Sequence, residues 1–138
     1  MDRADYERYV RCFNARDYDG VFDFYAEHPR ISFFGVEIRS REELKRFYGF
    51  LHRYVRETVE VERFASSDEL AAVEATVRIE GLEDLDAGTL AGNDLHGLFP
   101  IRAGEVRQMR QYIHYHLRDG RIEGVGCALA GGQPAATG

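Results

Sequence analysis

The chain has 138 residues and a formal net charge of −6 at pH 7. This length fits one domain with a hydrophobic core, and the excess of 24 acidic over 18 basic side chains argues against binding to nucleic-acid phosphates or anionic membranes. No apolar run approaches the ~20 residues of a transmembrane helix, and the N-terminus lacks the apolar stretch of a signal peptide, so we expect a soluble, cytoplasmic protein.

The N-terminal part of the chain has helical periodicity. Apolar side chains spaced at i, i+3, i+4 and i+7 predict a helix over about residues 4 to 14. They are Tyr6, Tyr9, Val10 and Phe13. Asp19 is positioned to cap a short second helix, which we expect Pro29 to end, because proline restricts the residue before it. A short strand is predicted over residues 31–34.

A third helix is predicted by its N-terminal signal. Ser40 and Glu43 have the spacing of a capping box, and apolar side chains continue after them at helical spacing. These side chains are Leu44, Phe47, Tyr48, Leu51 and Val55.

The hydrophobic period changes from 3.6 to 2 from residue 57 onward, which predicts strands. Alternating segments cover about residues 58–62 and 71–80, and a polar, glycine-containing segment over 81–104 then interrupts the pattern, long enough for a lid over a pocket. Two further strands, 105–117 and 121–130, are expected to be joined by a hairpin turn at Asp119 and Gly120. Cys12 and Cys127 fall on a predicted helix face and a predicted strand and are expected to be free thiols.

Helices followed by strands predict an α+β fold, with three N-terminal helices packed on a curved, mostly antiparallel sheet. We expect a single domain over residues 1–130 and a flexible tail over 131–138. The space between the helices and the sheet would be a cone-shaped pocket, which is a common location for a ligand.

Two segments resemble a known superfamily. Residues 8–21 are similar to the opening of the bacterial ketosteroid isomerases, and the hairpin over 116–122 resembles the last strand pair of the same group. This group is the nuclear transport factor 2-like superfamily, which also contains the SnoaL-like polyketide cyclases. The resemblance covers about residues 5 to 130 and implies a cystatin-like fold with a hydrophobic pocket.

The resemblance to the isomerases implies roles for three tyrosines. Tyr9 matches the donor of a hydrogen bond to a dienolate oxygen, and Tyr25 and Tyr48 match tyrosines that support it. The matches to the isomerases' carboxylic acids are Phe33 for the general base and Ile113 for the second oxyanion donor. Neither side chain can transfer a proton, so only weak ketosteroid isomerase activity is expected.

The cyclase pattern gives a similar result. Its acid/base carboxylate matches Cys127, and its helper histidine matches Ile113, unless a one-residue bulge brings His114 into the pocket instead. There is no match to the catalytic acid and arginine set of the limonene epoxide hydrolases. The apolar walls of the pocket are assigned to Phe13, Phe33, Phe47, Ile113 and Cys127, and Tyr25 is also assigned to the ligand site. The residues left open as general base are His28, His52, Asp94, His96 and His114.

The outer face of the sheet is predicted from strand parity. His114 and His116 share it with Tyr112, and their spacing could serve a metal site only with a third ligand from a neighbouring strand, such as Glu74. No metal or cofactor is expected. A solvated face or a subunit interface is the alternative, and we predict a homodimer through this face, because it carries aromatic and arginine side chains.

Three functions remain open on the sequence. The first is an isomerase or cyclase that acts on a small hydrophobic carbonyl compound of steroid, polyketide or terpenoid type, with Tyr9 as oxyanion donor. The second is a noncatalytic domain that binds a hydrophobic ligand, and the third is a dimeric interaction domain whose pocket is filled. A carboxylate or histidine in the pocket near Tyr9 would favour the first.

Overall fold

The structure is a computed structural model, and it describes residues 1–131. The helices in this part are α1 (Arg3–Asn14), α2 (Tyr18–Phe22), α3 (Arg41–Tyr54) and α4 (Ala87–Gly92). The strands are β1 (Tyr25–Phe33), β2 (Val36–Ile38), β3 (Val55–Ser66), β4 (Leu70–Gly81), β5 (Val106–Arg118) and β6 (Arg121–Leu129). The tail predicted over 131–138 lies outside the described residues except for Gly131.

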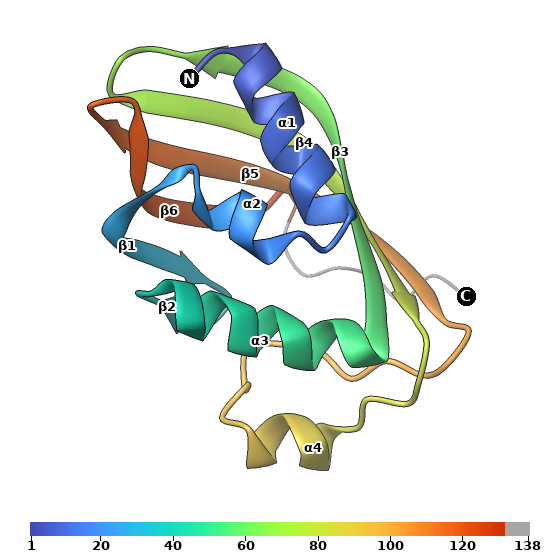
Figure 1. The fold of residues 1–138 in the computed structure, drawn as a ribbon. Coiled ribbons are helices and arrows are strands. Elements are labelled where there is room, and N and C mark those ends of the chain that lie inside the picture. Colours follow the sequence, from blue (N-terminus) through green and yellow to red (C-terminus); the bar gives the residue numbers. More distant parts are fainter. Residues whose placement is uncertain (132–138) are drawn as a thin grey trace.

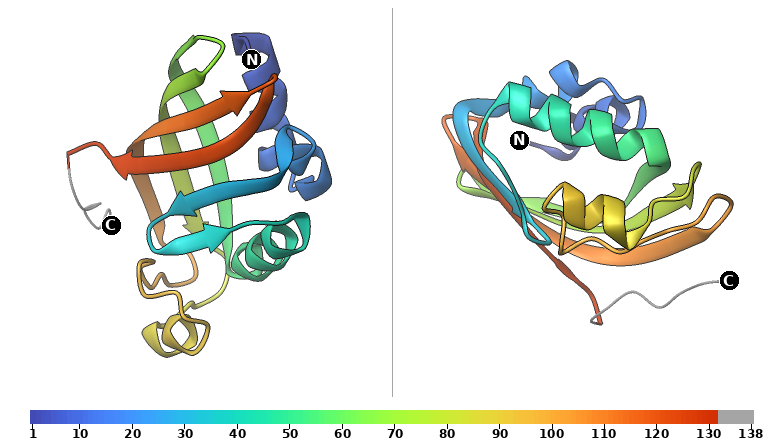
Figure 2. Two further views of the ribbon diagram at one scale, coloured as in Figure 1. Left: turned by 90° about the vertical axis from the view of Figure 1, so that its left-hand side faces the viewer. Right: turned by 90° about the horizontal axis from the view of Figure 1, so that it is seen from below.

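The strands form one curved sheet in the order β2-β1-β6-β5-β4-β3. All neighbouring pairs are antiparallel except β1 and β6, which are parallel. Helices α1, α2 and α3 lie on one side of this sheet, and α4 lies at the end where α3 meets β3 (Figures 1 and 2). The predicted α+β class, with three N-terminal helices on a mostly antiparallel sheet, is therefore confirmed.

The helix starts follow from local capping. Asp2 caps α1 in a capping box with Asp5, and the predicted cap of α3 is confirmed, because the Ser40 hydroxyl accepts a hydrogen bond from the Glu43 amide at 3.1 Å. The Glu43 carboxylate accepts instead from the Arg39 amide at 2.6 Å. Helix α3 passes directly into β3 at Tyr54 and Val55, with no loop between them.

The predictions for the second helix and the first strand were wrong in two details. The cap of α2 is Asp17, whose carboxylate accepts from the Gly20 amide at 3.0 Å, while Asp19 pairs with Arg41 and Lys45. Helix α2 ends at Phe22, and Pro29 lies inside β1. The strand tolerates proline there because its pairing with β6 is interrupted between Tyr25 and Arg30, so no ladder N–H is lost.

The hairpin predicted at Asp119 and Gly120 joins β5 to β6. Both turn residues have positive φ, 51° and 77°, as a tight two-residue hairpin requires. Within the segment 81–104, Leu85 pairs with Ile101 and packs with Leu90 in a small apolar cluster under α4. This packing holds residues 97–101 at the end of the space enclosed by α3 and the sheet.

Candidate functional site

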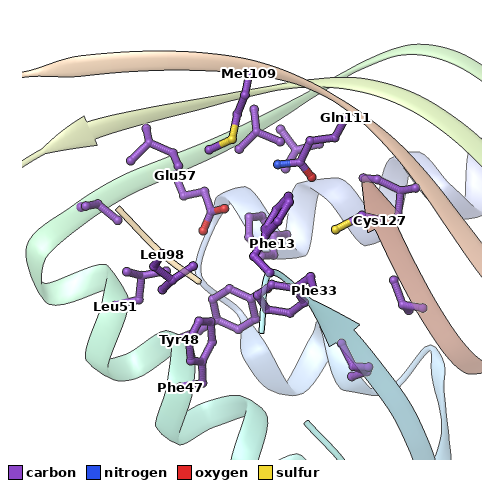
Figure 3. Close-up of a pocket in the computed structure, with 18 of the residues that line it drawn as sticks. Phe13, Phe33, Phe47, Tyr48, Leu51, Glu57, Leu98, Met109, Gln111 and Cys127 are labelled. Atoms are coloured by element: carbon purple, nitrogen blue, oxygen red, sulfur yellow. The ribbon is translucent and has the colours of Figure 1, made fainter. Parts of the chain in front are cut away.

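A cavity of about 190 Å³ lies between the helices and the inner face of the sheet (Figure 3). Its walls are mostly aliphatic and aromatic, and all eight residues that the sequence assigns to the site line it. They are Tyr9, Phe13, Tyr25, Phe33, Phe47, Tyr48, Ile113 and Cys127. Leu98, Phe99 and Ile101 line the same cavity, so the segment 81–104 contributes to its wall.

Tyr9 lies in a group of four buried tyrosines. Its hydroxyl is 2.6 Å from the Tyr25 hydroxyl, and the Tyr6 and Tyr115 hydroxyls are 2.8 Å apart. Burial raises the pKa of Tyr9 to about 12 and also raises the pKa of Tyr25. Both phenols are therefore neutral at physiological pH and can donate hydrogen bonds but cannot serve as bases.

Tyr48 has a different environment from the one expected. The Tyr9 hydroxyl is bonded to Tyr25 and not to Tyr48, so the expected support of Tyr9 by Tyr48 stays a prediction. The Tyr48 ring stacks on Phe33 and packs against the His52 ring at 5.2 Å between centroids. Its hydroxyl has no hydrogen-bonding partner among residues 1–131, so it is a further neutral donor in the cavity wall.

The cavity contains one carboxylate, Glu57, which the sequence analysis missed. Glu57 Oε1 lies 3.0 Å from His52 Nε2, and the two side chains are 16% and 2% exposed. Figure 3 shows the Glu57 side chain reaching from β3 into the cavity. The pKa of the Cys127 thiol is raised to about 11, first by burial and second by the negative charge of Glu57.

A sequence signal for Glu57 existed. Residue 57 has the same parity as Val59 and Val61, the apolar residues of the alternating segment over 58–62, so a glutamate there points toward the core. A charged side chain on an apolar strand face is unusual unless it has a partner. The partner, His52, was among the open candidates for a general base.

His52 is fixed on all sides. Its Nδ1 lies 2.7 Å from the Tyr18 hydroxyl, and its ring packs edge-on against Phe13. The Tyr18 hydroxyl also lies 3.3 Å from the main-chain carbonyl of Tyr48. Burial raises the pKa of Tyr18, so this phenol is neutral as well. Tyr18, His52 and Glu57 therefore form one continuous chain of hydrogen bonds that ends at the cavity.

Gln111 is the second polar side chain that strand parity could have revealed. It lies on β5 between Met109 and Ile113, all three lining the cavity, and it is 7% exposed. Figure 3 shows its amide directed into the cavity. The amide has no hydrogen-bonding partner in the part of the chain that the structure describes. An amide that opens onto the cavity and has no protein partner can form a hydrogen bond with a polar group of a ligand.

The other open candidates lie outside the cavity. His28, Asp94, His96 and His114 are exposed. Ile113 faces the cavity as predicted without a bulge, because the register shift between β5 and β6 lies further along, between His116 and Leu117. Residues 1–131 contain no group of three or more His, Cys, Asp or Glu side chains that could hold a metal ion.

Comparison with known proteins assigns the chain to a family. Residues 6–125 match the family described as SnoaL-like domain. The chain belongs to the SnoaL-like family. No curated protein sequence matches this SnoaL-like protein. Within residues 1–131, no helix is long and apolar enough to cross a membrane.

Solved structures support the same fold for this SnoaL-like protein. A candidate polyketide cyclase from Silicibacter sp. TM1040 is 24% identical, with a TM-score of 0.72 over 90% of this chain and 85% of that chain. A second candidate polyketide cyclase, from Xanthomonas campestris pv. campestris, is 20% identical, with a TM-score of 0.70 over 88% and 84%. A protein from Catenulispora acidiphila with a ketosteroid isomerase-like fold, 7% identical, has a TM-score of 0.68 over 93% and 86%. These likenesses show the nuclear transport factor 2-like fold.

Proposed function

We propose that this SnoaL-like protein catalyses proton transfer on a small hydrophobic carbonyl compound, with Glu57 as the general base. The observation that carries the proposal is the Glu57 carboxylate, which lines an apolar cavity and is bonded to the buried His52. A base in such a cavity acts on a bound C–H group without competition from bulk water. In this proposal the catalytic carboxylate lies on β3, whereas the positions that match the catalytic acids of the isomerases and cyclases hold Phe33, Ile113 and Cys127.

The hydrogen bond from His52 involves only one of the two oxygens of the Glu57 carboxylate. Nε2 contacts Oε1, so Oε2 of Glu57 can accept a proton from a substrate. His52 holds the carboxylate in one orientation, and its own ring is held by Tyr18 and Phe13. Orientation of this kind is what a general base requires, because proton transfer depends on a short, aligned contact.

Neutral donors in the same cavity can stabilise an enolate oxygen. In the pair of hydroxyls of Tyr9 and Tyr25, one hydrogen forms the bond between them, and the hydrogen of the accepting hydroxyl is available to a ligand. The Gln111 amide and the Tyr48 hydroxyl are further donors. Donors that are fixed before the charge develops are effective in a site that excludes water. Tyr9 as oxyanion donor is part of this proposal.

The size of the cavity narrows the ligand class. A dry protein cavity of about 150 Å³ holds benzene, so the cavity of about 190 Å³ in this protein suits a molecule of one or two rings. A four-ring steroid exceeds this volume. Within the steroid, polyketide and terpenoid types, we therefore favour compact terpenoid-like or one- and two-ring polyketide-like ketones.

The experiment measures proton exchange on 2-tetralone, a two-ring ketone with acidic C–H groups beside its carbonyl. In heavy water, proton NMR follows the loss of these hydrogens, with the rate in buffer alone subtracted. Wild-type protein should accelerate exchange, and Glu57→Gln should slow it about 100-fold or more, since general bases contribute about 10²–10⁴-fold. Glu60→Gln, which changes an exposed glutamate on the same strand, is the matched control. A Glu57→Gln variant with the wild-type rate would contradict the proposal.

The apolar lining favours one second candidate, a noncatalytic domain that binds a hydrophobic ligand. Saturable binding of 2-tetralone to the wild-type protein without acceleration of exchange would support that function instead. The third function, an interaction domain with a filled pocket, is disfavoured by the cavity volume of about 190 Å³.

A further inference from the structure

The hydrogen-bonded side chains of Tyr18, His52 and Glu57 have more possible hydrogen bonds than are needed to hold the base. The Tyr18 oxygen lies within hydrogen-bonding distance of two groups, His52 Nδ1 at 2.7 Å and the Tyr48 carbonyl oxygen at 3.3 Å. A hydroxyl has only one hydrogen, so it can donate to only one of them at a time. A carbonyl oxygen can only accept. The Tyr18 hydroxyl therefore either donates to Nδ1, or donates to the Tyr48 carbonyl and accepts a hydrogen bond from Nδ1–H.

Two arrangements of the hydrogens on Tyr18, His52 and Glu57 give every donor an acceptor. When Glu57 is ionised, Nε2–H of His52 donates to Oε1, and the Nδ1 lone pair accepts from the Tyr18 O–H. When Glu57 carries a proton on Oε1, that O–H donates to Nε2, Nδ1–H donates to the Tyr18 oxygen, and the Tyr18 O–H turns to the Tyr48 carbonyl. His52 is neutral in both arrangements, and every donor has an acceptor.

The two arrangements differ by one proton. To convert the first into the second, the Tyr18 hydrogen moves to Nδ1, the Nε2 hydrogen moves to Glu57 Oε1, and Tyr18 takes a replacement proton from water. A proton that Oε2 takes from a ligand enters this path when the carboxyl group turns so that the protonated oxygen faces Nε2. The reverse sequence then removes the proton from Glu57 and releases one at Tyr18. No other bond is formed or broken. His52 is 3% exposed, so a proton from solvent can reach it only through a neighbour, and Tyr18 is the half-buried residue on the side away from the cavity.

We propose that Tyr18 and His52 form a proton relay that exchanges the proton of Glu57 with solvent while the cavity is occupied. The role of the relay rests on the proposed function of Glu57 as a base. Tyr18 is a positioning residue, because it contacts His52 and does not line the cavity. The relay allows the base to be reset without release of the ligand, since the bound ligand blocks the direct path of water to Glu57.

The hydrogen bonds are tested by nitrogen-15 NMR of the His52 ring in the ligand-free protein near neutral pH. We expect a neutral ring with hydrogen on Nε2, and we expect the Nδ1 resonance to shift in Tyr18→Phe, which lacks the donor. Tyr112→Phe removes an exposed hydroxyl on the outer face and should leave the His52 resonances unchanged. A doubly protonated ring in the wild type, or an unchanged Nδ1 resonance in Tyr18→Phe, would overturn the relay. This readout requires no activity.

The exchange reaction tests the transfer itself. With 2-tetralone in heavy water, Tyr18→Phe should lower the exchange rate at saturating ketone roughly tenfold, below the range of about 10²–10⁴ for a group that contacts substrate, because Tyr18 acts through His52. The dissociation constant for 2-tetralone should stay the same. If Glu57→Gln abolishes exchange and Tyr18→Phe does not slow it, the relay is wrong and the base stands. If Glu57→Gln has no effect, the proposed function fails, and the NMR result alone decides whether Tyr18 controls His52.

Discussion

His52 Nε2 lies 3.0 Å from Glu57 Oε1, across the point where helix α3 becomes strand β3. The helix ends at Tyr54 and the strand begins at Val55, so residues five apart in sequence face each other. The contact ties a partly exposed carboxylate to the last turn of a helix. Stability and chemistry at this site are therefore linked.

Loss of the histidine should destabilise the fold. His52→Leu keeps an apolar side chain of moderate size but leaves Glu57 without its donor, and we expect the free energy of unfolding to fall by about 2 to 3 kcal/mol, the upper range for hydrogen bonds to charged groups. Urea unfolding measures this change. His28→Leu, at an exposed histidine, is the matched control and should have little effect. Equal stabilities of the two variants would mean that the His52 contact contributes nothing.

The tyrosine pair should affect anion binding. Tyr9→Phe keeps the ring and removes the hydroxyl, and we expect it to weaken binding of 4-nitrophenolate, a one-ring mimic of an enolate, by roughly 1 to 3 kcal/mol. Tyr25→Phe should produce a similar loss, because the two hydroxyls share one hydrogen bond. Any loss in Tyr48→Phe should add to that of Tyr9→Phe, since the two hydroxyls are not bonded to each other. Titration calorimetry measures these affinities, and an unchanged affinity in Tyr9→Phe would remove Tyr9 from the site.

High pH should destabilise the protein. Burial raises the pKa of Tyr9 from 10.0 to about 12 and that of Cys127 from 9.0 to about 11. The folded state holds these protons more tightly than the unfolded state, so its stability is complete below about pH 9 and declines as pH rises to about 12. Tyr9→Phe should reduce the decline by on the order of 2 to 3 kcal/mol. Urea unfolding across this range tests the expectation, which fails if the wild type and Tyr9→Phe lose stability equally.

A homodimer through the outer face of the sheet remains a prediction. Tyr112 is 45% exposed on this face, while Arg110 already pairs with Glu62 of the same chain at 3.0 Å, so the aromatic side chain is the main reason to expect a partner. Light scattering at micromolar concentration should give twice the chain mass of 15.8 kDa. Tyr112→Glu should give the single mass, and Leu82→Glu, at an exposed position off this face, should not. A monomeric wild type would exclude the dimer.

The fold was largely predictable because its signals are local. The capping serine Ser40, the period-2 strands and the turn at Asp119 each act over a few residues. Pro29 misled the prediction because whether a strand tolerates proline depends on the pairing of a distant strand, β6. The place of Pro29 inside a strand could therefore be recognised only from the tertiary structure.

The walls of the site were predictable, and its chemistry was not. Residue matching placed the acids at Phe33, Ile113 and Cys127, which line the cavity but carry no carboxylate. The carboxylate comes instead from Glu57, at a position that strand parity marks as inward. The contact with His52 depends on the direct passage of α3 into β3, which a sequence pattern does not reveal.

The central claim is that the Glu57 carboxylate moves the proton, and chemical rescue tests it most directly. Glu57→Ala removes the carboxylate and leaves space for a small anion in the cavity. The account predicts that Glu57→Ala does not accelerate exchange of 2-tetralone, that added formate restores exchange in a saturable manner, and that formate does not accelerate the wild type. Exchange by Glu57→Ala at the wild-type rate without formate would contradict the account.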